Sequence, residues 1–255
     1  MNADYEMTGN VKVLVLGHRG YRSKYLENTI ESIIGALKAG ADGVEVDVRL
    51  TRDGVPIVYH DPSLRRLAGV KKRVKELTVS DVKNLKVRKS APIPTLAEVL
   101  DVIVKYSSRR PLIDLEVKDY KASGRLLKLV EERCLLDTTI FTSSDPRALI
   151  QLRMHSRGAK LGYIVRRPST MFNPFILHEK VGLEVASVSV SLKRSLGVEM
   201  LRRYLRSLKL VGLKVALWTL NDPRDLDLFQ GLYDIVITDD VEKILKSLRR
   251  SQRND

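Results

Sequence analysis

The chain has 255 residues, of which 44% are hydrophobic and 30% charged, and its formal net charge is +14. This length supports one large core, and α/β barrels of this size are ordinary single domains. Cys134 is the only cysteine, which excludes an intramolecular disulfide and therefore a secreted disulfide scaffold.

Short apolar runs alternate with amphipathic stretches from one end of the chain to the other. The strand-like runs cover residues 11–17, 43–50, 111–118, 138–143, 160–166, 184–191, 214–220 and 233–239. Helix-like stretches lie between most of them, with examples at 28–40, 95–107, 123–136 and 198–212. Strands that alternate with helices pair in parallel through right-handed crossovers, and eight of them in about 250 residues match a (β/α)8 barrel. We therefore predict a single-domain TIM barrel over 11–248, with flexible ends at 1–10 and 249–255.

The stretch after the second predicted strand does not fit this alternation. The run "VPIVYHD" (55–61) would make a ninth strand. Asp53-Gly54 favours a two-residue type I′ turn that returns the chain antiparallel, so we predict a hairpin extension after the second strand. In that register residue 52 pairs with 55, and Asp47 lies opposite His60. The lysine- and arginine-rich segment 62–94 is predicted to form a short irregular insertion, with a helix near 78–86.

Polar side chains gather where three of the predicted strands end. A histidine and an arginine follow the first strand, and two acids share a face of the second. A histidine ends the hairpin, and an acid and a lysine share a face of the third strand. Active sites of such barrels form at the C-terminal ends of the strands, so we expect these side chains to meet in one mouth. They are His18, Arg19, Glu45, Asp47, His60, Glu116 and Lys118. The structural alternative is a salt-bridged barrel lining, in which Arg49 and Lys118 neutralise the acids.

The residue types in this set indicate a particular chemistry. Three carboxylates in one mouth repel one another unless their pKa values rise or a cation binds. An oxygen-only set suits a hard divalent ion such as Mg²⁺ or Ca²⁺. Two histidines beside it suit proton transfer near neutral pH, and an arginine and a lysine suit a phosphate.

These motifs occur in an order that resembles one known family. The segments "GHRG", "ENT", "GADGVEVDVRLTRDGVPIVYHD", "IPTLAEVL", "LEVK", "LWTLND" and "DIVITDD" follow one another as in the glycerophosphodiester phosphodiesterase family. The resemblance spans residue 16 to about residue 245, essentially the whole chain. It implies a TIM barrel that hydrolyses glycerophosphodiesters to an alcohol and glycerol phosphate with a divalent metal ion.

The resemblance also implies roles for individual residues. The acid/base pair would be His18 and His60, and the metal ligands Glu45, Asp47 and Glu116, with Mg²⁺, Ca²⁺ or Mn²⁺ as the ion. Phosphoryl oxygens would be held by Arg19 and Lys118, and Trp218 would form an apolar wall for the glycerol. Glu27 would border the site, whereas Asn28 with Glu31 fits a capping box for the first helix.

Three residues with reactive side chains lie outside this set. Cys134 is in the amphipathic stretch "RLLKLVEERCLL", where we expect a buried helical position. His155 and His178 match no motif, and we expect them at the surface or in helix packing.

Other functions and partners remain open at this stage. A lysophospholipase D-type phosphodiesterase acting on lysolipids and, less favoured, a non-catalytic phosphodiester-binding barrel are the alternatives. We expect a small-molecule phosphodiester substrate and no nucleic acid, because no basic block is interleaved with aromatic residues. The basic surface leaves weak contact with an anionic membrane open. The first apolar run is too short for a signal peptide or a membrane span, so we expect a cytoplasmic protein of undetermined oligomeric state.

Overall fold

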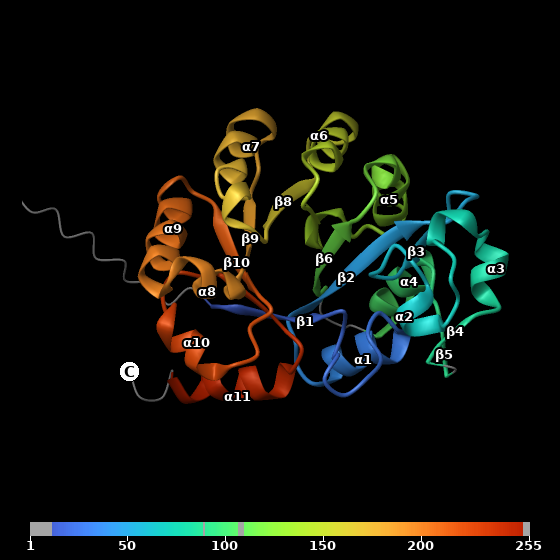
Figure 1. The fold of residues 1–255 in the computed structure, drawn as a ribbon, viewed down its shortest axis with the longest axis horizontal. Helices are drawn as coiled ribbons and strands as arrows, with labels where there is room; N and C mark the ends of the chain where they lie inside the picture. Colours follow the sequence, from blue (N-terminus) through green and yellow to red (C-terminus); the bar gives the residue numbers. More distant parts are fainter. Residues whose placement is uncertain (1–11, 89, 107–109, 252–255) are drawn as a thin grey trace, which may run out of the picture.

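The computed structural model describes residues 12–88, 90–106 and 110–251 (Figure 1). The predicted flexible ends 1–10 and 252–255 lie outside these ranges. Residues 249–251, the rest of the predicted flexible C-terminal end, belong to the last helix, α11 (Val241–Ser251). No helix in the described ranges is both long enough and apolar enough to cross a membrane.

The predicted barrel is confirmed. Eight parallel strands in the described ranges follow one another around it, and the first strand pairs with both the second and the last, which closes the sheet. The strands are β1 (Leu14–His18), β2 (Gly43–Leu50), β6 (Leu112–Val117), β7 (Thr139–Ser143), β8 (Lys160–Val165), β9 (Val185–Ser189), β10 (Lys214–Trp218) and β11 (Ile235–Thr238).

Helices surround this barrel (Figure 1). They are α1 (Ile30–Lys38), α4 (Leu96–Tyr106), α5 (Ser123–Glu131), α6 (Pro146–His155), α7 (Asn173–Val181), α8 (Lys193–Leu196), α9 (Val198–Leu210), α10 (Pro223–Leu228) and α11. Single 3-10 turns lie at η2 (Tyr120–Ala122), η3 (Leu136–Thr138), η4 (Pro168–Thr170) and η5 (Val190–Leu192).

The core lies mainly between the strands and these helices. On β2, Val44, Val46 and Val48 belong to it and are fully buried. Each buried valine contributes about 1.5–3 kcal/mol through the hydrophobic effect. Side chains alternate across a strand, so this packing directs Glu45 and Asp47 to the inside of the barrel.

The hairpin exists, but its predicted register is wrong. β2 pairs antiparallel with β3 (Pro56–Val58), with Val48 opposite Val58. Thr51 and Val55 close the loop through the Thr51 N–H and the Val55 carbonyl (3.1 Å), so the turn has three residues instead of two. Gly54 has a φ of +77°, the left-handed position that a three-residue hairpin requires. The Thr51 hydroxyl accepts the Val55 N–H (2.9 Å) and thereby favours the longer loop.

This difference of one residue changes how His60 reaches the mouth. The backbone N–H of Tyr59, and not that of His60, donates a hydrogen bond to the Asp47 carbonyl (2.9 Å). A slip of one residue reverses the face of every side chain on a strand. The chain therefore bends at His60 and Asp61, beyond the end of β3. Arg49 holds the bend, because its Nε donates to the His60 carbonyl (2.8 Å).

The segment after the hairpin forms small elements over a separate apolar cluster. These are α2 (Arg65–Ala68), η1 (Val74–Glu76), α3 (Val79–Lys83), β4 (Lys86–Val87) and β5 (Ala91–Pro92). The cluster includes Ile57 and Tyr59 from the hairpin together with Leu64 and Leu67 from the segment. This packing secures the start of the segment, and with it Arg66, beside the mouth.

The expected positions of Cys134, His155 and His178, which lie outside the predicted site, can be compared with the structure. The prediction for Cys134 is wrong: it is exposed, has a φ of +53°, and lies beyond the end of α5 at Glu131. His155 is exposed, and His178 lies with its Nδ1 2.6 Å from the Leu183 carbonyl oxygen. Both histidines are therefore surface or packing residues, as expected.

Gly43 lies where β2 pairs with β6, and the backbone of β6 leaves no room there for a side chain. A Cβ atom at Gly43 would lie 1.9 Å from the Leu112 carbonyl oxygen on β6, whereas one at Gly158 would lie no closer than 3.8 Å to another group. We expect Gly43→Ala to lower the free energy of unfolding by about 1–3 kcal/mol or more, because the strands must separate. Urea denaturation of both variants measures this, and equal midpoints for Gly43→Ala and Gly158→Ala would contradict it.

Candidate active site

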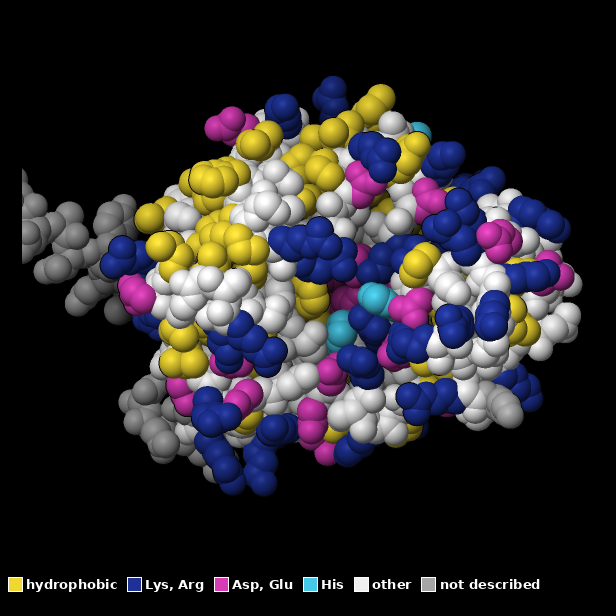
Figure 2. All heavy atoms as spheres, in the orientation of Figure 1, with side chains coloured by type: hydrophobic (Ala, Val, Ile, Leu, Met, Phe, Trp, Pro, Cys, Tyr) yellow, Lys and Arg dark blue, Asp and Glu magenta, His cyan; other side chains and the backbone are white. Residues whose placement is uncertain are grey.

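Most predicted site residues line one cavity at the C-terminal ends of the strands. Figure 2 shows the mouth as a hollow with histidines at its centre and lysine or arginine side chains around it. The predicted residues that line the cavity are His18, Arg19, Glu45, His60, Glu116 and Trp218. The other two, Asp47 and Lys118, lie directly behind them and are almost fully buried.

The three predicted metal ligands come together. Parallel pairing of β2 with β6 sets Asp47 beside Glu116, and Glu45 lies two residues earlier on the same face. Carboxylate oxygens of Glu45, Asp47 and Glu116 all lie within 4.8 Å of one another. Asp47 is fully buried, so water hardly reaches its carboxylate. An oxygen-only set of three clustered carboxylates fits a hard divalent cation.

Two cations partly offset these acids. Lys118 Nζ lies 2.9 Å from Asp47 Oδ1 and 2.6 Å from Glu116 Oε1. The guanidinium Nε of Arg19 lies 3.2 Å from Asp47 Oδ2. The backbone N–H of Arg19 donates to Glu45 Oε2 (2.9 Å). Of the two cations in the structural alternative, Lys118 contacts the acids directly, whereas Arg49 donates to the His60 carbonyl and acts on the acids only through its charge.

The carboxylates differ in pKa because their neighbours differ. Although burial opposes ionisation, Lys118 and Arg19 hold the pKa of Asp47 well below its usual range. Burial, reinforced by the charges of Asp47 and Asp114, raises the pKa of Glu45 well above its usual range. Burial also raises the pKa of Glu116 despite its contact with Lys118. The mouth therefore favours added positive charge.

Each histidine has one ring nitrogen held by a carboxylate. His18 Nδ1 lies 2.7 Å from Asp239 Oδ1, and its Nε2 is 3.9 Å from Glu45 Oε2. His60 Nδ1 lies 2.7 Å from Asp61 Oδ1. A carboxylate at Nδ1 favours the tautomer with its proton there, which leaves Nε2 as the free acceptor. Burial lowers the pKa of His60.

Asn28 has a different role from the predicted one. The helix cap is Thr29, whose hydroxyl accepts the Ser32 N–H (3.2 Å). Asn28 has a φ of +58° and donates its amide to Asp47 Oδ2 (2.8 Å). Asparagine tolerates this left-handed conformation better than most residues, a signal that the sequence analysis did not use.

Three further polar residues that the sequence analysis missed belong to the site. Asp61 and Asp239 hold the two histidines, and Asn221 donates to Asp239 Oδ2 (2.8 Å). Asp239 directly follows β11, so the rule about strand ends could have identified it. Asn221 follows β10 at the same end of the barrel, and only its contact with Asp239 identifies it as a site residue.

The far wall of the cavity combines an apolar surface with one cation. Trp218, Ile164 and Ile237 line it, and Trp218 Nε1 donates to the Ser187 carbonyl (3.1 Å). Arg166 follows β8, which lies opposite β1 in the strand order. Its Nη2 donates to the Ser144 hydroxyl (2.7 Å), a neutral partner, and it contacts no carboxylate among the described residues. Its charge is therefore available to an anion in the cavity.

The chain is similar in sequence and fold to known proteins. A model of the "Glycerophosphoryl diester phosphodiesterase family" matches residues 18–243. A glycerophosphodiester phosphodiesterase of Caldanaerobacter subterraneus is 27% identical over 253 residues, covering 94% of this chain and 99% of that protein. The crystal structure of a glycerophosphodiester phosphodiesterase from Thermotoga maritima is 35% identical with a TM-score of 0.77, covering 92% of this chain and 98% of that one.

A second solved structure supports the fold. The structure of an Oleispira antarctica phosphodiesterase in complex with the product sn-glycerol-3-phosphate is 23% identical, with a TM-score of 0.81, and covers 92% of this chain and 96% of that one. The family match spans all the residues that line the cavity. The chain therefore belongs to the glycerophosphoryl diester phosphodiesterase family of hydrolases.

Proposed function

We propose that the chain hydrolyses glycerophosphodiesters to an alcohol and glycerol phosphate, using a divalent metal ion and two histidines. The observation that carries this proposal is the shared cavity, in which two carboxylate-held imidazoles flank a cluster of three acids. Hydrolysis of a phosphodiester needs the charge on the phosphoryl oxygens to be neutralised. It also needs a group that takes a proton from the nucleophile and a group that gives one to the leaving oxygen, and this cavity offers groups for each.

The metal would be held by Glu45, Asp47 and Glu116. When bound, Mg²⁺, Ca²⁺ or Mn²⁺ supplies a Lewis acid that polarises a phosphoryl oxygen. Arg19 and Lys118 keep Asp47 ionised and add positive charge beside the phosphate. Arg166 adds a guanidinium on the cavity wall, where its hydrogen-bond partner is the neutral Ser144 hydroxyl. Trp218 supplies an apolar wall for the glycerol carbons.

The two histidines would divide the proton transfers between them. One Nε2 takes a proton from the nucleophile as its bond to phosphorus forms, and the other imidazolium protonates the departing alkoxide as the second P–O bond breaks. General acid/base catalysis of this kind contributes roughly 10²–10⁴-fold. Either water or the neighbouring glycerol hydroxyl serves as the nucleophile, and either histidine fits either role.

A substrate panel tests the proposed reaction. We expect turnover of glycerophosphodiesters that EDTA abolishes and that Mg²⁺, Ca²⁺ or Mn²⁺ restores, because the three acids need a cation. Release of glycerol phosphate measures it. A lysolipid arm addresses the main alternative: faster turnover of lysophosphatidylcholine than of glycerophosphocholine would favour a lysophospholipase D. Activity insensitive to EDTA would refute the metal site.

Substitution of the histidines tests their roles. We expect His18→Ala and His60→Ala each to lower kcat at least roughly a hundredfold, because each removes one proton carrier. The circular dichroism spectrum should not change. His155→Ala, on the exposed surface, is the matched control with normal turnover. Near-normal turnover in either site variant would rule out the two-histidine assignment.

Arg166 offers a test of substrate binding. We expect Arg166→Gln to raise KM at least about tenfold, since a charge-assisted hydrogen bond to phosphate is worth roughly 1.5–3 kcal/mol. Arg167→Gln, at the exposed neighbouring position, is the control. An unchanged KM for Arg166→Gln would show that this guanidinium does not contact the substrate.

A further inference from the structure

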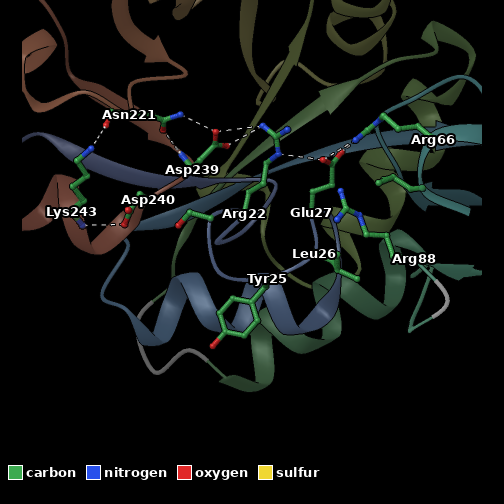
Figure 3. A pocket seen from close by; sticks show the side chains of 12 residues that line it. Arg22, Tyr25, Leu26, Glu27, Arg66, Arg88, Asn221, Asp239, Asp240 and Lys243 are labelled. Atoms are coloured by element: carbon green, nitrogen blue, oxygen red, sulfur yellow. Dashed lines mark hydrogen bonds and ion pairs between the residues drawn. The ribbon is translucent and has the colours of Figure 1, made fainter.

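A chain of ion pairs leads away from His18 to a buried glutamate. His18 Nδ1 contacts Asp239 Oδ1 at 2.7 Å, and Arg22 Nη1 lies 3.4 Å from Asp239 Oδ2. The same guanidinium donates through Nε to Glu27 Oε2 (3.2 Å). Figure 3 shows Arg22 between Asp239 and Glu27. One guanidinium therefore joins the carboxylate that holds His18 to Glu27.

A second chain leads from His60 to the same glutamate. His60 Nδ1 contacts Asp61 Oδ1 at 2.7 Å, and Arg66 Nε donates to Asp61 Oδ2 (2.5 Å). Arg66 also binds Glu27 with two nitrogens, Nη2 to Oε1 (2.7 Å) and Nη1 to Oε2 (3.1 Å). Such fork-like pairs restrict orientation as well as adding energy. In Figure 3, Arg66 approaches Glu27 from the side opposite Arg22.

Glu27 is thus the point where both chains meet. Its side chain is 6% exposed, and a third guanidinium, that of Arg19, donates to its Oε1 (2.8 Å). Although burial opposes ionisation, hydrogen bonds from Arg66 and Arg19 lower the pKa of Glu27 to about 2. Without its negative charge, three guanidinium groups would lie around a neutral side chain and repel one another.

On the basis of the proposed function, we propose that Glu27 is a positioning residue that orients the catalytic histidines through Arg22 and Arg66. Glu27 contacts neither imidazole, so it acts through Asp239 and Asp61. Side chains of Arg22 and Arg66 are 39% and 43% exposed, on a cavity of about 560 Å³. Both can turn into solvent when Glu27 loses its charge.

The two branches are not equally dependent on Glu27. Asp239 keeps other partners, because Asn221 donates to its Oδ2 (2.8 Å) and accepts its backbone N–H (2.8 Å). Asp61 has Arg66 and His60 as its side-chain partners among the described residues. Loss of Glu27 should therefore loosen His60 much more than His18.

The test is Glu27→Gln, which removes the charge and keeps the shape. We expect kcat to fall at least about tenfold with KM within about twofold, because a displaced general acid or base affects the chemical step. Imidazole ¹⁵N NMR should show His60 losing its dominant Nδ1–H tautomer while His18 keeps it. Arg66→Gln should reproduce the His60 signal, whereas Arg22→Gln should not alter it.

A double variant separates positioning from general stability. If Glu27 acts through Arg66, Glu27→Gln with Arg66→Gln should lower kcat little more than either change alone. Asp225→Asn is the matched control, because Asp225 is equally buried and paired with Lys193 outside this network. It should lower the melting temperature without affecting kcat or the His60 signal.

The outcomes distinguish this proposal from the function on which it rests. Full kcat and an unchanged His60 tautomer in Glu27→Gln, with His60→Ala inactive, would refute the positioning role alone. An active His60→Ala would refute the two-histidine reaction itself. Should Glu27→Gln fail to fold, Arg66→Gln carries the same kinetic and NMR test from a part-exposed position, and normal values there would also refute the proposal.

Discussion

The repulsion among three clustered carboxylates is the constraint on which the mouth of this barrel depends. Glu45, Asp47 and Glu116 place oxygens within 4.8 Å of one another; Glu45 and Asp47 are buried, and the Glu116 side chain is 13% exposed. Burial raises the pKa of Glu45 and Glu116, whereas Lys118 and Arg19 keep Asp47 ionised. Two protein cations against three acids leave a site that favours one more cation.

Backbone conformation contributes to this arrangement. Arg19 and Asn28 both have positive φ angles, of 54° and 58°. Residues other than glycine rarely adopt this conformation, and where they do it is often at functional sites. Here it lets the backbone N–H of Arg19 reach Glu45 and the Asn28 amide reach Asp47. The loop between β1 and α1 thus orients two of the metal-ligand candidates without supplying one itself.

Electrostatic support extends beyond the acids to the imidazoles. Asp239 and Asp61 select one nitrogen of each histidine, and arginines in turn select one orientation of each carboxylate. Each group in such a network is satisfied only when its neighbours are in place.

The sequence by itself determined the barrel and the gathering of polar residues in its mouth, because strand and helix periodicity is local and strand ends of a parallel barrel meet on one face. It could not decide the register of the hairpin, since the Thr51 hydroxyl and left-handed Gly54 favoured a three-residue loop over the Asp-Gly turn. Contacts such as His18 with Asp239, 221 residues apart, exist only once the barrel has closed. The tertiary structure alone therefore decided which nitrogen of each histidine is held and which residues hold it.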